Sequence, residues 1–138
     1  LTGEYASIPQ EMCQVAAYFG KKVLREVKEE DVLANLSALR QKVGDRAVLR
    51  ALHFYADDQR AVKEADALAS GEKESFLNLV KESGRSSWEL LQNITPAAAV
   101  EHQDMAIALT VAEKALNGEG LPCSRWWFCR NNPGICSA

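Results

Sequence analysis

Apolar residues recur at every third or fourth position through most of this 138-residue chain, which limits the folds open to it. This spacing places apolar side chains along one face of an α-helix. A strand would instead alternate apolar and polar residues, and such alternation is confined to a brief stretch at residues 22–27. The pattern therefore predicts a mainly α fold of about five helices.

Prolines, glycines and acidic residues set the expected boundaries of the first helices. Proline is favoured in the first turn of a helix, so we expect the first helix to begin near Pro9 and to end at Gly20. The preceding residues 1–5 are typical of the end of a strand or a turn. Acids at 29–31 suit the start of a second helix, which Gly44 closes.

Two long helices are expected in the middle of the chain. The first has an N-cap at Asp45 and continues to the Ser-Gly break at residues 70–71. The second extends from about residue 73 to residue 94, with a kink at Gly84. Because the break between them is short, the two helices should pack antiparallel.

The last helix is expected to have Thr95 as its N-cap and Pro96 as its first residue, and to end at residues 117–118. Its centre, residues 106–112, is nearly all apolar. A helix of this kind needs a partner over most of its surface. If the chain is a separated part of a larger domain, an apolar stripe should stay uncovered and drive self-association.

Composition excludes several classes of function. The net charge is −3, and acidic and basic residues are interleaved, so neither nucleic acid nor an anionic membrane surface is expected as a partner. No apolar run approaches the roughly 20 residues of a membrane span, and no signal peptide is visible. Four cysteines are too few and too uneven for a disulfide framework, which favours reduced thiols and a cytoplasmic location. The chain begins at Leu1 without methionine, and we expect a longer parent.

No catalytic constellation is recognisable in the sequence. Phosphate-binding glycine motifs are absent, and the glycines stand singly, several of them at expected helix ends. His53 and His102 are expected to be packing or surface residues. A solvated ion-pair face is expected for the charged residues of the first long helix, namely Asp57, Asp58, Arg60, Lys63 and Glu64. The residues alone therefore assign no catalytic, cofactor-binding or metal-binding position.

Three ordered segments carry a resemblance to a known family. They are RALHFYADDQR at residues 50–60, ALASGE at 67–72 and FLNLVKES at 76–83. In order and spacing they resemble the C-terminal domain of galactokinases, members of the GHMP kinase superfamily. The family's usual Ser-His pair is replaced by Ser83-Gly84, which is typical of a divergent subgroup.

The resemblance implies that residues 1–120 form the helical layer of an α+β GHMP kinase C-terminal domain. The intact parent would use ATP and Mg²⁺ to phosphorylate galactose or a related monosaccharide, with an N-terminal kinase domain as this chain's partner. By the same resemblance Tyr5, in LTGEY, is a candidate contact to the sugar. It implies no catalytic, cofactor or metal site in this chain, which alone should be inactive.

Three alternatives remain open at this point. Tyr5 is equally well an ordinary half-buried tyrosine. The parent could be another GHMP kinase that acts on a different small alcohol. The chain could also be a non-enzymatic helical interaction module, which should have a polar outer face on every helix.

Residues 121–138 form an irregular tail that contains two of the three tryptophans and three of the four cysteines. The single codon for tryptophan at residues 126–127 forces most of a glycine run in the next reading frame. With allowed codons that frame gives RVHGGGFAGTIQAFVP, which resembles the family's third glycine-rich signature, so we expect an out-of-frame tail. One alternative is a natural tail that serves as a docking or membrane-interface segment. Another is a metal site at Cys123, Cys129 and Cys136, which the lack of a Cys-x-x-Cys pair and of a nearby histidine disfavours.

Overall fold

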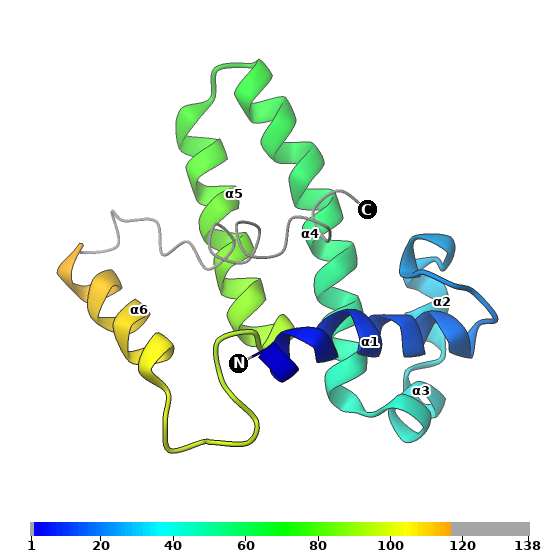
Figure 1. Cartoon of the computed structure of the whole chain (residues 1–138). Helices are drawn as coiled ribbons and strands as arrows, with labels where there is room; N and C mark the ends of the chain where they lie inside the picture. Colours follow the sequence, from blue (N-terminus) through cyan, green and yellow to red (C-terminus); the bar gives the residue numbers. More distant parts are fainter. Residues whose placement is uncertain (1, 117–138) are drawn as a thin grey trace.

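The computed structural model describes residues 2–116, with side chains from residue 5 onward. All regular structure in that range is helical (Figure 1). The prediction of a mainly α fold is confirmed for this part of the chain. The expected tail at residues 121–138 lies outside the described residues.

The chain order of the elements is simple. The α-helices are α1 (Thr2–Tyr18), α2 (Glu29–Ala34), α3 (Leu36–Val43), α4 (Asp45–Ala69), α5 (Lys73–Ser86) and α6 (Asp104–Ala115). A 3-10 turn, η1 (Leu24–Glu26), precedes α2, and a π-helical segment, η2 (Ser87–Leu91), continues α5.

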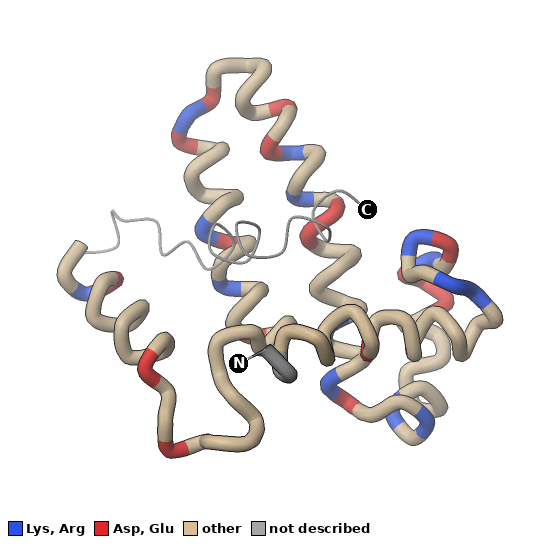
Figure 2. The backbone as a smooth tube through the Cα atoms, viewed as in Figure 1, with Lys and Arg blue, Asp and Glu red and all other residues tan. Residues whose placement is uncertain are grey.

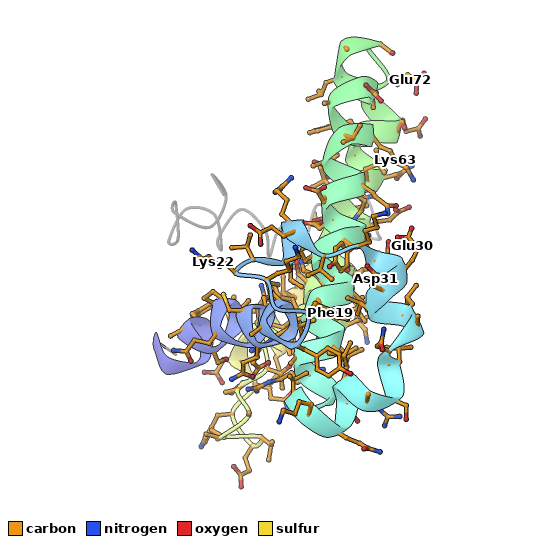
Figure 3. The ribbon with its side chains drawn as sticks, turned by 90° about the vertical axis from the view of Figure 1, so that its right-hand side faces the viewer. Phe19, Lys22, Glu30, Asp31, Lys63 and Glu72 are labelled. Carbon is orange, nitrogen blue, oxygen red and sulfur yellow. The ribbon has the colours of Figure 1, made fainter. Side chains whose placement is uncertain are left out.

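Helices α4 and α5 form a long antiparallel hairpin, as predicted (Figure 1). The chain reverses at Gly71, whose φ of +72° is a backbone conformation that glycine adopts without a steric penalty. In the side view of Figure 3, Lys63 and Glu72 project outward from this hairpin. The tip of the hairpin is therefore solvated, and its base carries the packed interior.

The core lies where α1 crosses the first half of α4 and where η1, α2 and α3 fold around both (Figure 1). Phe19, at the end of α1, packs against this core (Figure 3). Its buried members are Val15, Ala16, Leu24, Val27, Val32, Leu39, Ala47, Val48 and Ala51.

The N-terminal helix is longer than predicted. It begins at Thr2 and continues through Pro9, so the expected turn at residues 1–5 is wrong for residues 2–5. Proline inside a helix removes a hydrogen bond, and packing must compensate for it. Ile8, only 2% exposed, buries its side chain immediately before Pro9.

The second predicted helix is divided into α2 and α3 at Asn35. The Asn35 amide donates a hydrogen bond to the carbonyl of Asp31 at 2.8 Å, a local bond that competes with continuation of the helix. Residues 24–26 form η1 in place of an alternating stretch. Asp45 is the first residue of α4 and not its N-cap, because its carboxylate accepts a hydrogen bond from Arg40 at 2.7 Å.

The C-terminal boundaries also differ from the prediction. Gly84 lies within α5, and the helix continues to Leu91 by widening into η2. Gln92 ends it with a φ of +55°. Helix α6 then begins at Asp104, so the predicted start at Thr95 and Pro96 is wrong: after the left-handed Gln92 the chain passes through an irregular segment up to Gln103.

Helix α6 stands apart from the hairpin (Figure 1). Ala106 is its only buried residue. The large apolar residues that it exposes, together with Leu116 just after it, are Met105, Ile107, Val111 and Leu116. None of the described helices is both long enough and apolar enough to cross a membrane.

Candidate functional site

One face of α4 carries a row of polar residues beneath α1, α5 and η2, which we call the polar ladder. Its members follow one another at spacings of three or four residues, so they share one side of the helix. Arg50 is 1% exposed and His53 is 6% exposed. The ladder consists of Arg46, Arg50, His53, Asp57 and Arg60.

Arg50 joins three separate elements. Its Nη1 atom lies 2.9 Å from Glu11 Oε2 and donates a hydrogen bond to Ser7 Oγ at 2.8 Å, both on α1. Its Nε atom donates to the carbonyl of Leu91 in η2 at 3.0 Å. Glu11 also accepts a 2.6 Å bond from Arg46 Nη2. Charge-assisted bonds of this kind are the stronger class, so α1, α4 and η2 are held at one point.

The second half of the ladder faces α5. His53 Nδ1 and Ser86 Oγ are 2.9 Å apart, and His53 Nε2 lies 4.0 Å from Asp57. Asp57 Oδ1 accepts hydrogen bonds from Ser83 Oγ at 2.7 Å and from Arg60 Nε at 3.2 Å. His53 is thus a buried packing residue.

The expectation of a wholly solvated ion-pair face needs correction. Asp57 and Arg60 have side chains only 21% and 14% exposed: Asp57 bonds to Ser83 of α5, and Arg60 bonds to Asp57. Asp58 does face solvent, where it pairs with Arg25 at 3.1 Å. His102 is exposed, in the segment before α6.

Every side chain of the polar ladder has a partner within the protein. A general base or a nucleophile has to present an atom to a substrate, whereas these side chains are engaged within the fold, and Arg60 Nη2, which has no hydrogen-bond partner, is buried. The ladder can therefore position helices, but its geometry offers no reacting group. Among the described residues, no group of three or more His, Cys, Asp and Glu is arranged to hold a metal ion.

Tyr5, the candidate sugar contact, lies in the N-terminal part of α1, two residues before Ser7. Its side chain is half-buried, and burial raises its pKa above the ordinary value of 10.0. The phenol therefore stays neutral and keeps both its donor and its acceptor. Tyr55 shows a stronger effect: burial, with Glu29 and Asp31 nearby, raises its pKa to about 12.

Two surface hollows have linings that do not include Tyr5. One, of about 310 Å³, is formed by the end of α5, η2 and α6 and is lined by Arg85, Trp88, Glu89 and Glu113. The other follows the outer face of α1 beside the exposed Cys13. Acidic and basic residues are interspersed along the α4–α5 hairpin, as Figure 2 shows.

Comparison with known proteins links part of the chain to one class of enzyme. Over 83 residues, 60% of its length, the chain is 32% identical to a galactokinase from Glaesserella parasuis serovar 5 (strain SH0165). Over 72 residues, 52% of its length, it is 35% identical to a galactokinase from Actinobacillus pleuropneumoniae serotype 5b (strain L20). The matches span 21% and 18% of those proteins, about a fifth of their length. No family model and no solved structure matches the chain. The two matches support a galactokinase-like relationship.

Proposed function

We propose that this chain is part of a cytoplasmic, galactokinase-like sugar kinase of the GHMP superfamily, which transfers the γ-phosphate of ATP to galactose or a related monosaccharide. The similarity to two galactokinases over 60% and 52% of the chain carries the proposal. In the intact enzyme, residues 1–120 form the helical layer of the second domain. An N-terminal kinase domain binds ATP and Mg²⁺.

The proposal includes that this chain alone is inactive. Phosphoryl transfer needs backbone amides around the phosphates, a cation that spreads their charge, and a group that orients the attacking hydroxyl. In the described part of the chain, Gly20, Gly44 and Gly71 have positive φ and end helices. Arg46 and Arg50 share the carboxylate of Glu11, and Arg60 pairs with Asp57. These features support a role in shaping the enzyme and not in the chemical step.

Tyr5 is the proposed contact to the sugar, so in the longer enzyme Tyr5→Phe should raise the KM for galactose by about three- to tenfold, the value of one neutral hydrogen bond. The kcat should change little, because the bond is made equally to substrate and transition state. Initial rates of ADP release at varied galactose would measure both constants. Tyr18→Phe is the matched control, since Tyr18 is exposed at the other end of α1. Equal KM values in the wild type and Tyr5→Phe would remove Tyr5 from the site.

The tail belongs to the same proposal. Residues 121–138 are proposed to be read out of frame through the third glycine-rich signature of the parent gene. Sequencing of the source DNA from well upstream of Leu1 to beyond Ala138 tests this directly. The proposal requires an upstream frame with the nucleotide loop and a second frame that reads Gly-Gly-Gly-Phe at residues 125–128. Codons that forbid this reading would make the tail genuine.

Helix α6 is proposed to drive self-association of the separated chain, because Ile107 and Val111 are 64% and 59% exposed. The double variant Ile107→Ser/Val111→Ser should weaken self-association by about tenfold or more, since each buried apolar side chain contributes about 1.5–3 kcal/mol. Sedimentation equilibrium over a range of concentrations measures this change. Val62→Ser is the control, because Val62 is equally exposed but lies on α4. A monomeric wild-type chain at all concentrations would contradict the proposal.

The rival proposal is a non-enzymatic helical module that binds another protein. Such a module should have a polar outer face on every helix. The exposed apolar side chains of α6 support the kinase proposal over this rival. Genuine in-frame codons for the tail would instead favour the module.

A further inference from the structure

Helix α1 contains a weak point just after its first turns. Pro9 lies inside the helix and has no N–H group, so it cannot donate the hydrogen bond that would tie it to the turn at Tyr5. Its ring also crowds the carbonyl four residues earlier. The backbone alone therefore couples residues 2–8 poorly to the remainder of α1.

Arg50 contacts α1 on both sides of this weak point. Ser7, which accepts a hydrogen bond from Nη1 at 2.8 Å, lies two residues before Pro9. Glu11, 2.9 Å from the same nitrogen, lies two residues after it. The Nε bond to the Leu91 carbonyl fixes the guanidinium against η2. With 1% exposure, this guanidinium has no alternative bonds to water.

We propose that Arg50 is a positioning residue that staples the two parts of α1 together across Pro9 and thereby sets the place of Tyr5. The effect of Arg50 on sugar binding through Tyr5 rests on the proposed function, whereas its effect on α1 does not. Lysine cannot replace arginine here, because one ammonium lacks the rigid fork that reaches Ser7, Glu11 and Leu91 at once. Ile8 anchors the same turn by burial, whereas Arg50 determines its alignment with the residues after Pro9.

The staple can be tested on the 138-residue chain by amide hydrogen exchange. Arg50→Met and Arg50→Lys should each accelerate amide exchange at residues 6–8 about tenfold more than at residues 77–82 of α5. This is the size of effect expected when hydrogen bonds to a charged group are lost. Arg40→Met is the control, because Arg40 pairs with Asp45 on the surface. Equal acceleration in both segments would show only general destabilisation and would overturn the proposal.

Two further variants separate a staple from a general structural role. Pro9→Ala restores the missing N–H donor, so it should return most of the protection at residues 6–8 in the Arg50→Met background. Ser7→Ala removes the hydroxyl that accepts the bond from Arg50 Nη1, and it is suited to the case in which Arg50 variants fail to fold. Alanine favours helix more than serine does, so helix propensity alone predicts slower exchange at residues 6–8, whereas the staple predicts faster exchange. Slower exchange in Ser7→Ala would overturn the proposal.

The position of Tyr5 provides an independent readout. With 3-fluorotyrosine at the three tyrosines, each ¹⁹F resonance can be assigned from a Tyr→Phe variant and titrated. Burial raises the pKa of Tyr5, so in Arg50→Met the pKa of the fluorinated Tyr5 should fall toward that of free 3-fluorotyrosine, whereas Arg40→Met should leave it unchanged. An unchanged Tyr5 titration in folded Arg50→Met would overturn the proposal.

In the longer enzyme, Arg50→Lys should raise the KM for the sugar and leave the KM for ATP unchanged, as expected of a residue that acts through Tyr5. Failures at the two levels are distinguishable. If exchange at residues 6–8 responds as described but the wild-type longer protein phosphorylates no sugar, the staple stands and the proposed function falls. If the sugar KM of an active enzyme does not respond, the link from Arg50 to the sugar falls.

Discussion

Glu11→Ala should lower the free energy of unfolding of this chain by about 3–5 kcal/mol, because it leaves a buried arginine without its counter-ion. Arg50 is 1% exposed and cannot turn to water, and the half-buried Arg46 loses its carboxylate in the same step. The Glu11 side chain is itself 16% exposed, so we expect the lower end of this range. Urea unfolding followed by circular dichroism would measure the loss.

Two comparisons define what the Glu11 result means. Asp45→Ala breaks the exposed pair with Arg40, and it should leave the free energy of unfolding almost unchanged. The double variant Glu11→Leu/Arg50→Met removes both buried charges and should recover much of the stability lost in Glu11→Ala. A Glu11→Ala chain as stable as the Asp45→Ala chain would contradict the buried ion pair.

Leu39→Ala should cost about 2–5 kcal/mol, the usual range for a large-to-small change in a packed core. Leu39 is fully buried on α3, where it belongs to the cluster shared by α1, α2 and α4. Because α3 packs on both α1 and α4, a cavity here loosens two contacts at once. Thermal and urea unfolding would both report the loss.

Leu33→Ala is the matched control for Leu39→Ala. Leu33 lies on the neighbouring α2 and is 47% exposed, so the same chemical change removes little buried surface. If Leu33→Ala destabilised the chain as much as Leu39→Ala, the described core would be wrong in this region.

Local sequence signals predicted the central hairpin well. Apolar spacing and the break at residues 70–71 were sufficient to predict α4, the start of α5 and the turn between them, because both helices are long and the turn is formed by residues adjacent in sequence. Gly44 likewise ended the preceding helix where expected, with a φ of +89°. These features depend on residues that are neighbours in sequence.

Boundaries that depend on tertiary contacts could not be predicted. Pro9 signals a helix start, yet α1 begins earlier because Ser7 and Ile8 are held by distant groups. The prediction that the last helix starts at Thr95 was wrong for a related reason. Thr95 and Pro96 form a locally acceptable cap, but Gln92, in a left-handed conformation, leads into an irregular segment.

The sequence could predict the ladder residues on α4 but not their partners on other helices. Spacing alone could have identified the polar ladder, since its five residues share one face of α4. Its partner Glu11 lies 39 residues before Arg50, and no local pattern joins the two. The role proposed for Tyr5 rests on resemblance, and the fold adds its half-buried place beside Ser7.

Sugar-dependent ADP release by the longer protein that contains this chain, measured beside the 138-residue chain itself, tests the kinase proposal most directly. With ATP and Mg²⁺ present, we expect the longer protein to release ADP when galactose or a related monosaccharide is added. We expect the 138-residue chain to release none above background. Turnover by the 138-residue chain, or no sugar-dependent ADP release by the longer protein across a panel of hexoses, would contradict the proposal.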